Sequence, residues 1–225
     1  RDGTVTGVQT CALPICPLLR RSGDWRSTPI ELASGAGAIP PGGVLIGSPG
    51  DHPELAALNG RLRAGEPARL EPEGFRLSVG REGVRVAAAA PAGAFYALQT
   101  LAEAIDAHGA PPPMRISETP AAPFRGIHFF LHDPNDIPVL ERFIRDAAPR
   151  LRANVLVAEI NYHFRFQSHP EINERTMFSA SEVRGLSRLC RGHNLRLIPM
   201  LNCFGHQSWG ENIRGLLRAY PQFNE

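Results

Sequence analysis

Histidine is the residue type in this sequence that offers the most chemistry, since imidazole serves both as a metal ligand and as an acid–base group. His128 and His132 stand four residues apart in an apolar stretch with the pattern of a strand. Two side chains so spaced share a face but lie roughly 13 Å apart, too far for two ligands of one ion. His163 and His169 bracket a loop with no cysteine or carboxylate set to complete a site. We therefore expect no metal and no cofactor.

Nucleophilic chemistry finds no support either. A Gly-x-Ser-x-Gly elbow, which would expose a serine nucleophile at a strand–helix turn, is absent from the sequence. Two of the four cysteines, Cys11 and Cys16, belong to an unusual N-terminal stretch. The other two, Cys190 and Cys203, are isolated and match neither a disulfide framework nor a zinc-site spacing. The cysteines thus leave the redox compartment open.

Composition excludes two classes of partner. The formal net charge is +2, and because the charges are interspersed we expect no nucleic-acid or anionic-membrane surface. No apolar run approaches the roughly 18 residues of a membrane span.

The first residues do not fit the rest of the chain. Residues 5–15, VTGVQTCALPI, show neither strand nor helix periodicity and lack the features of a signal peptide. One back-translation of this stretch is similar to a common short-read sequencing adapter. All 24 basic residues are arginine, which fits a GC-rich, bacterial genome. We interpret residues 1–16 as a cloning or assembly scar; the alternative is a genuine irregular N-terminus.

The elements expected for residues 17–110 form a small α/β domain. The patterns predict strands at 29–32 and 44–49, a helix at 51–63 with Asp51 as N-cap, a hairpin over 74–89, and a helix at 91–105. Residues 111–123 contain repeated prolines and are expected to be a linker without regular structure.

From residue 124 to 225 strands and helices alternate. Strands are expected within 124–132, 154–164 and 195–205, and helices within 136–153, 179–194 and 211–220. Ser179 and Glu182 form a capping-box pattern, and Pro138 suits a first helical turn. The first strand is apolar enough to be covered on both faces, which is typical of a parallel sheet or barrel. Three such units cannot close an eight-stranded barrel.

Three segments carry a family resemblance: GAFYALQTLAEAI (93–105), PFRGIHFF (123–130) and RLIPMLNCFGHQSW (196–209). Their order resembles the domain junction and early barrel of family 20 glycoside hydrolases, the β-N-acetylhexosaminidases. The resemblance implies a small α/β domain followed by the first three βα units of a truncated (β/α)8 TIM barrel.

It also implies a retaining, substrate-assisted hydrolase that removes terminal N-acetylhexosamine from glycans. The family's catalytic Asp-Glu pair follows strand four, and no such pair occurs in this sequence. The chain by itself is therefore expected to be inactive.

The same resemblance assigns sugar-binding residues. It implies that the RG arginine, Arg125, and the Gly-His histidine, His206, bind substrate, with Gln207 and Trp209 in the same loop. Glu159, Asn161 and His163 occupy the second strand and its end; these are expected to line the pocket. Each residue also has a structural alternative: a surface or ion-paired Arg125, a buried structural His206, a packing Trp209, a structurally paired Glu159.

Two departures from the family pattern leave a second function open. Phe130 stands where the family usually has an aspartate, and Asn161, Tyr162 and His163 stand where it often has paired aspartates. The alternative is a relative that has lost catalysis and only binds carbohydrate. A downstream Asp-Glu pair would separate the two. In either case a carbohydrate is the expected partner.

Overall fold

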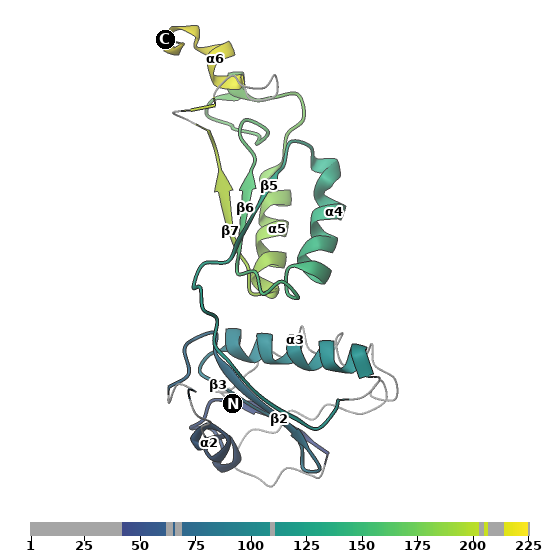
Figure 1. The fold of residues 1–225 in the computed structure, drawn as a ribbon. Helices are drawn as coiled ribbons and strands as arrows, with labels where there is room; N and C mark the ends of the chain where they lie inside the picture. Colours follow the sequence, from purple (N-terminus) through teal and green to yellow (C-terminus); the bar gives the residue numbers. More distant parts are fainter. Residues whose placement is uncertain are drawn as a thin grey trace, which may run out of the picture. The chain divides into compact units, whose positions relative to one another are not determined.

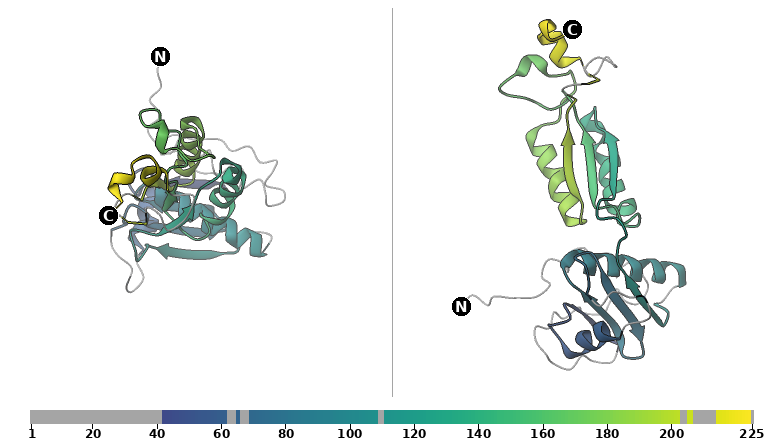
Figure 2. Two further views of the ribbon diagram at one scale, coloured as in Figure 1. Left: turned by 90° about the horizontal axis from the view of Figure 1, so that it is seen from above. Right: turned by 60° about the vertical axis from the view of Figure 1, so that its left-hand side comes forward.

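The computed structural model describes residues 42–61, 65, 69–108, 111–202, 205–206 and 214–224. The chain divides into two compact units, Arg1–Pro123 and Phe124–Glu225 (Figures 1 and 2). The predicted scar at 1–16 and the predicted strand at 29–32 lie outside the described residues.

The first unit is built on a four-stranded sheet in the order β1-β3-β2-β4. β1 runs parallel to β3, and β2 runs antiparallel to both β3 and β4. The elements are β1 (Val44–Gly47), α2 (Pro53–Gly60), β2 (Phe75–Gly80), β3 (Gly83–Ala88), α3 (Pro91–His108) and β4 (Met114–Glu118).

The predicted hairpin and the helix after it are confirmed. Two residues connect β2 to β3, and the third strand begins at Gly83, whose φ is +106°. A side chain at Gly83 would also collide with the backbone of Gly43. Both the positive φ and this close approach therefore require glycine at this position.

Helices cover the sheet of the first unit on opposite faces (Figure 1). Successive side chains along each strand point to opposite faces of the sheet, so that alternate residues pack on α3 and the residues between them face α2. The hydrophobic core on the α3 side comprises Phe75, Leu77, Val79, Val84, Val86, Ala88, Ala94, Phe95, Tyr96, Ala97, Leu98, Leu101 and Ile105. The core on the α2 side is small, made of Leu55, Leu58 and Ala87.

Two expectations for this unit are wrong. The N-cap of α2 is His52, whose Nδ1 accepts from the Glu54 N–H at 3.2 Å. Asp51 instead accepts from the Ser48 N–H at 2.6 Å and so closes the preceding turn. The supposed linker at 111–123 contains β4, because its prolines flank the strand and leave residues 114–118 with N–H groups that pair with β2.

The second unit contains a three-stranded parallel sheet in the order β5-β6-β7. Its main elements are β5 (Gly126–Phe130), α4 (Ile137–Arg142), β6 (Val155–Glu159), α5 (Ala180–Gly192) and β7 (Arg196–Met200). The predicted strand–helix alternation and parallel pairing are confirmed. α4 is shorter than predicted and continues as the π-helical stretch η3 (Phe143–Ala147). The capping box of Ser179 and Glu182 at the start of α5 is confirmed in both hydrogen bonds.

Successive side chains of β5 point alternately to the covered face and to the open face of the sheet. Ile127 and Phe129 pack into the core against the helices, whereas His128 and Phe130 are exposed. The expectation that both faces of this strand are covered is therefore wrong for the described chain, since α4 and α5 pack on one face. That core comprises Leu131, Leu140, Ile144, Ala148, Ala153, Leu156, Ala158, Ile160, Phe178, Leu186, Cys190 and Leu195.

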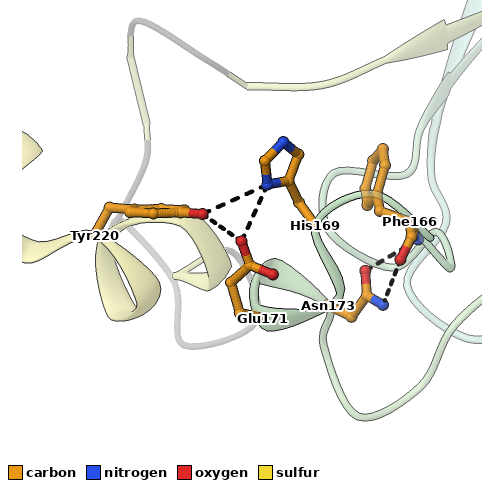
Figure 3. A network of polar contacts seen from close by, with 5 residues as sticks. All are labelled: Phe166, His169, Glu171, Asn173 and Tyr220. Atoms are coloured by element: carbon orange, nitrogen blue, oxygen red, sulfur yellow. Dashed lines mark hydrogen bonds and ion pairs between the residues drawn. The ribbon is translucent and has the colours of Figure 1, made fainter.

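The segment between β6 and α5 is held by side-chain contacts (Figure 3). The Asn173 amide both accepts from the Phe166 N–H at 3.1 Å and donates to the Phe166 carbonyl at 3.2 Å. The short 3-10 helix η4 (Pro170–Ile172) lies in this segment, and α6 (Gly215–Ala219) and η6 (Pro221–Phe223) follow β7.

α6 is fastened to that segment at three points. Gly215 packs so closely on Ile172 that a Cβ would strike the Ile172 carbonyl oxygen. Arg218 pairs with Glu174 at 3.0 Å. The Tyr220 hydroxyl donates to Glu171, which also lies 3.1 Å from His169 Nδ1 (Figure 3).

Candidate functional site

The carboxyl ends of β5, β6 and β7 meet at one edge of the parallel sheet, where polar side chains gather. The register pairs Phe130 with Glu159 and Glu159 with Met200. These three side chains therefore project to the open face of the sheet. Glu159 is the last residue of β6, and it is the charged member of this row.

The carboxylate of Glu159 is buried, with its side chain 4% exposed, and it is held by three donors. Oε1 accepts from Asn161 Nδ2 at 2.9 Å and from Asn202 Nδ2 at 2.8 Å. Oε2 lies 2.9 Å from His128 Nε2. Because a buried charge is costly unless it is hydrogen-bonded, these donors account for a carboxylate at this position.

Asn161 and Asn202 connect two neighbouring strand ends. Asn161 Oδ1 accepts from the Asn202 backbone N–H at 3.0 Å. The φ of Asn161 is +49°, a left-handed conformation that asparagine adopts more readily than most residues. The Tyr162 hydroxyl adds a bond to the Asn202 carbonyl at 3.1 Å. Hydrogen bonds made by these side chains thus join the ends of β6 and β7.

Two further imidazoles stack beside this network. The rings of His132 and His163 lie 4.8 Å apart with 20° between their planes. Thr176 secures both residues, because its hydroxyl donates to the His132 carbonyl at 2.7 Å and its carbonyl lies 2.9 Å from His163 Nδ1. Burial, and next the neighbouring His163, lower the pKa of His132, which favours its neutral form.

The structure brings together two of the predicted site residues, Glu159 and Asn161, which bond directly. The predicted His163 instead stacks on His132 and contacts Thr176. Nor does the structure bring Arg125 to Glu159 and Asn161. Arg125 precedes β5, at the opposite, amino edge of the sheet, where its Nε donates to the Arg152 carbonyl at 2.6 Å.

The remaining predicted residues follow β7. His206 is exposed and has a left-handed backbone with φ +56°. Gln207, Trp209 and the isolated cysteine Cys203 lie outside the described residues. Cys190 is free and buried in the core, and burial raises the pKa of its thiol to about 11, so it is inert as a nucleophile at neutral pH.

Two members of the network, His128 and Asn202, are not among the site residues predicted from the sequence. The sequence pattern offers His128 only as a metal ligand, which its distance from His132 excludes. A signal for Asn202 was present in the spacing, because Asn161 and Asn202 each stand two residues beyond the end of their strand. Equivalent positions on adjacent parallel strands lie side by side, so matched amides there indicate a shared contact.

The network has the chemistry of a site that binds hydroxyl groups. Amides and imidazoles offer both donors and acceptors to a neutral polar ligand. No group of three or more potential metal-ligating side chains occurs within the described ranges. In the same part of the chain, no helix is long and apolar enough to cross a membrane.

A family model described as "Glycosyl hydrolase family 20, domain 2" matches residues 25–119. This range includes the whole described sheet of the first unit, and it ends one residue after β4. A search of curated proteins finds no match.

Solved structures similar to the chain carry the same family name. An inactive mutant of a family 20 exo β-N-acetylglucosaminidase from Vibrio harveyi matches with a TM-score of 0.65 and 14% identity, over 95% of this chain and 33% of that one. The β-N-acetylhexosaminidase from Streptomyces coelicolor A3(2) matches with a TM-score of 0.58 and 21% identity, over 85% of this chain and 48% of that one.

A mutant Streptomyces plicatus β-hexosaminidase in complex with the product GlcNAc matches with a TM-score of 0.58 and 18% identity, over 84% of this chain and 38% of that one. The chain thus spans less than half the length of each of these three structures. At these identities the likeness is one of fold. Residues 25–119 therefore match the family's domain 2 in sequence, and the rest of the chain resembles these structures in fold.

Proposed function

We propose that this chain is the front part of a retaining, substrate-assisted β-N-acetylhexosaminidase that hydrolyses terminal N-acetylhexosamine from glycans. In this proposal β5, β6 and β7 are the first three strands of a (β/α)8 barrel, and residues 124–225 begin its catalytic domain. We also propose that residues 1–16 are a cloning or assembly scar and not native sequence, and that the small domain at 17–110 precedes the barrel.

The observation that carries it is the buried Glu159 network at the carboxyl edge of a parallel sheet. Active sites of (β/α)8 barrels lie at this edge, and side chains at strand ends build them. Glu159 and Asn161 provide a fixed polar wall there, directly after a domain that matches the family model. On the same face the ring of Phe130, paired with Glu159 in the register, is 54% exposed and is therefore accessible to a ligand.

The proposed chemistry needs residues that this sequence does not supply. In the substrate-assisted scheme the acetamido oxygen of the sugar attacks the anomeric carbon while a carboxylic acid protonates the leaving oxygen. An adjacent Asp-Glu pair does this work in the resembled family, and the 225 residues contain no such pair. We therefore propose that this chain contributes binding residues and, alone, does not turn over.

Among the residues proposed to bind substrate, the edge cluster has the strongest support. Glu159, Asn161 and His163 come from one strand end, and His206, Gln207 and Trp209 from the segment after the next strand. Arg125 is the weakest member of the set, because its Nε is engaged at the amino edge of the sheet.

The test is hydrolysis of 4-nitrophenyl N-acetyl-β-D-glucosaminide by the complete protein encoded by the parent gene and, separately, by the 225-residue chain. The complete protein is expected to hydrolyse it with initial release of the β-anomer, seen by proton NMR, and the 225-residue chain is expected to release nothing. The matched control is 4-nitrophenyl β-D-glucoside, which lacks the acetamido nucleophile and should be resistant.

A second function is favoured by one observation: the exposed ring of Phe130 replaces the family's usual aspartate at the strand end. A relative that only binds carbohydrate would show GlcNAc binding by the complete protein in NMR titration without hydrolysis of either glycoside. Turnover by the 225-residue chain itself would contradict both proposals.

A further inference from the structure

His128 is the half-exposed member of the Glu159 network. Its side chain is 42% exposed, while the carboxylate it contacts is 4% exposed. It lies on the open face of β5, opposite Val157 of β6, and its ring centroid lies 4.9 Å from that of Phe130. A buried acid therefore stands directly behind an imidazole that a ligand can reach.

The contact with Glu159 fixes the tautomer of His128. A carboxylate only accepts hydrogen bonds, so the imidazole nitrogen 2.9 Å from Oε2, Nε2, must carry the proton. In the neutral ring the other nitrogen, Nδ1, then presents a lone pair. A carboxylate that orients an imidazole in this way is the arrangement by which proteins prepare a histidine for acid–base or hydrogen-bonding work.

Glu159 itself cannot turn away from His128. Its other oxygen is held by the amides of Asn161 and Asn202, both buried and both at strand ends. Two amide donors on Oε1 aim Oε2 toward β5, and the carboxylate has little freedom in its 4% exposed position. The orientation of His128 is thus set by the backbone positions of three adjacent strands.

We propose that His128 is a further ligand-contacting residue of this site, with Nδ1 accepting a hydrogen bond from a sugar hydroxyl, and that Glu159 is the positioning residue that holds it. The inference rests on the proposed function for the identity of the ligand. A neutral imidazole lone pair suits a hydroxyl donor, whereas a carboxylate or phosphate would be repelled by the adjacent Glu159 charge.

The positioning role is tested first, in the 225-residue chain, by the near-isosteric variant Glu159→Gln. The glutamine oxygen can keep both asparagine donors, which leaves its amide N–H₂ facing His128. Two donors cannot bond, so the ring should exchange its proton and become the Nδ1–H tautomer. Histidine ¹⁵N NMR reports this directly: the wild type should show His128 as the Nε2–H tautomer, and Glu159→Gln should invert it. An unchanged tautomer overturns the positioning role.

The contact role is tested in the complete protein by His128→Phe and His128→Gln. Phenylalanine keeps a ring beside Phe130 but removes the nitrogens, and loss of one neutral hydrogen bond corresponds to roughly a 3- to 10-fold rise in KM. Glutamine can still donate to Glu159 through its N–H₂ group and can accept from the sugar hydroxyl through its carbonyl oxygen, so it should recover most of that loss. The matched control is His108→Gln at the exposed end of α3, in the other unit, which should leave KM unchanged.

The outcomes separate the two proposals. If the wild type hydrolyses the substrate and His128→Phe has an unchanged KM, the inference is overturned while the proposed function stands. If the wild type binds GlcNAc without hydrolysis, the proposed function fails. A larger dissociation constant for GlcNAc in His128→Phe than in the wild type would then still support the inference. A melting temperature that falls equally in both His128 variants, with equal rises in KM, assigns His128 a structural role and overturns the contact.

Discussion

Both units of the chain bury charge, but they place the partners of that charge differently. In the first unit Arg76 donates to Asn59, and Arg85 pairs with Glu54, so the guanidinium groups reach the covering helix α2. In the second unit the partners of Glu159 come from strand ends and from the open face of the sheet. The first arrangement docks a helix, and the second faces a surface that a ligand can reach.

The difference follows from how each sheet is covered. α3 and α2 pack on opposite faces of the first sheet, so its polar groups are used between layers. In the part of the chain that the structure describes, α4 and α5 pack on one face of the second sheet, and the other face carries His128, Phe130 and Glu159. Among the described elements, the buried polar network on the open face of the second sheet holds no helix in place. A buried polar group without such a structural role is a candidate for function.

The largest expected effect tests whether the two units unfold separately. Leu77→Ala in the first core and Leu156→Ala in the second each remove a side chain that is at most 1% exposed, and each should cost about 3 kcal/mol. Because the buried clusters are distinct, each variant should shift its own transition in urea unfolding of the 225-residue chain. A single transition shifted equally by both would contradict the independence of the units.

A smaller loss is expected from the polar network. Asn202→Ala removes the amide that donates to Glu159 at 2.8 Å and leaves a buried carboxylate with one donor fewer, at a cost of roughly 1–3 kcal/mol. The loss should appear in the second transition alone. The control is Asn135→Ala, an exposed residue of the same unit, which should leave both transitions in place.

These contrasts also show what the sequence could and could not predict. The hairpin, the parallel strands and the Ser179 capping box were predicted because each depends on neighbours in sequence: turn glycines, periodicity, an N3 glutamate. β4 was missed, since its proline-rich flanks conceal a strand that gains its hydrogen bonds from β2, about forty residues earlier in the chain.

The candidate site was predicted in part for the same reason. Glu159 and Asn161 are close in sequence and were found together, but the contacts of Glu159 with His128 and Asn202 cross three strands. Only the register places them side by side, and a single strand pattern does not specify register with its neighbours. The resemblance predicts that Arg125 and Glu159 share a site. In the structure Arg125 precedes β5 at the amino edge of the sheet, whereas Glu159 ends β6 at the carboxyl edge.

A helix cap gives the next smaller effect. Ser179→Ala removes the oxygen that accepts from the Glu182 N–H at 3.2 Å and half of the capping box of α5, which should cost about 1 kcal/mol. The second transition should shift by this amount and the first should stay. Ser179→Asp, which can still accept from the same N–H, should restore most of the loss; failure of aspartate to do so would point to a role other than capping.

The smallest effect concerns the exposed contacts that fasten α6, and it depends on pH. The Tyr220 hydroxyl, then a backbone N–H and His169, lower the pKa of Glu171 from 4.5 to about 2 (Figure 3). A carboxyl group whose pKa is lowered in the folded chain stabilises the docked state above pH 4.5 and loses that contribution as the pH falls toward 2. The protection factors of the α6 amides, which divide the intrinsic exchange rate at each pH by the observed rate, should therefore fall across this window in NMR measurements, while those of the α5 amides stay high.

Tyr220→Phe sharpens the same comparison because it removes the largest cause of the shift. The pKa of Glu171 should then move back toward 4.5, and α6 should loosen at a higher pH than in the wild type. The contact of Arg218 with Glu174, 3.0 Å long, is untouched by this variant and should keep α6 docked at neutral pH. If α6 in Tyr220→Phe loosens at the same pH as in the wild type, the Tyr220–Glu171 contact does not fasten it, and Gly215 packing with Arg218 accounts for the docking.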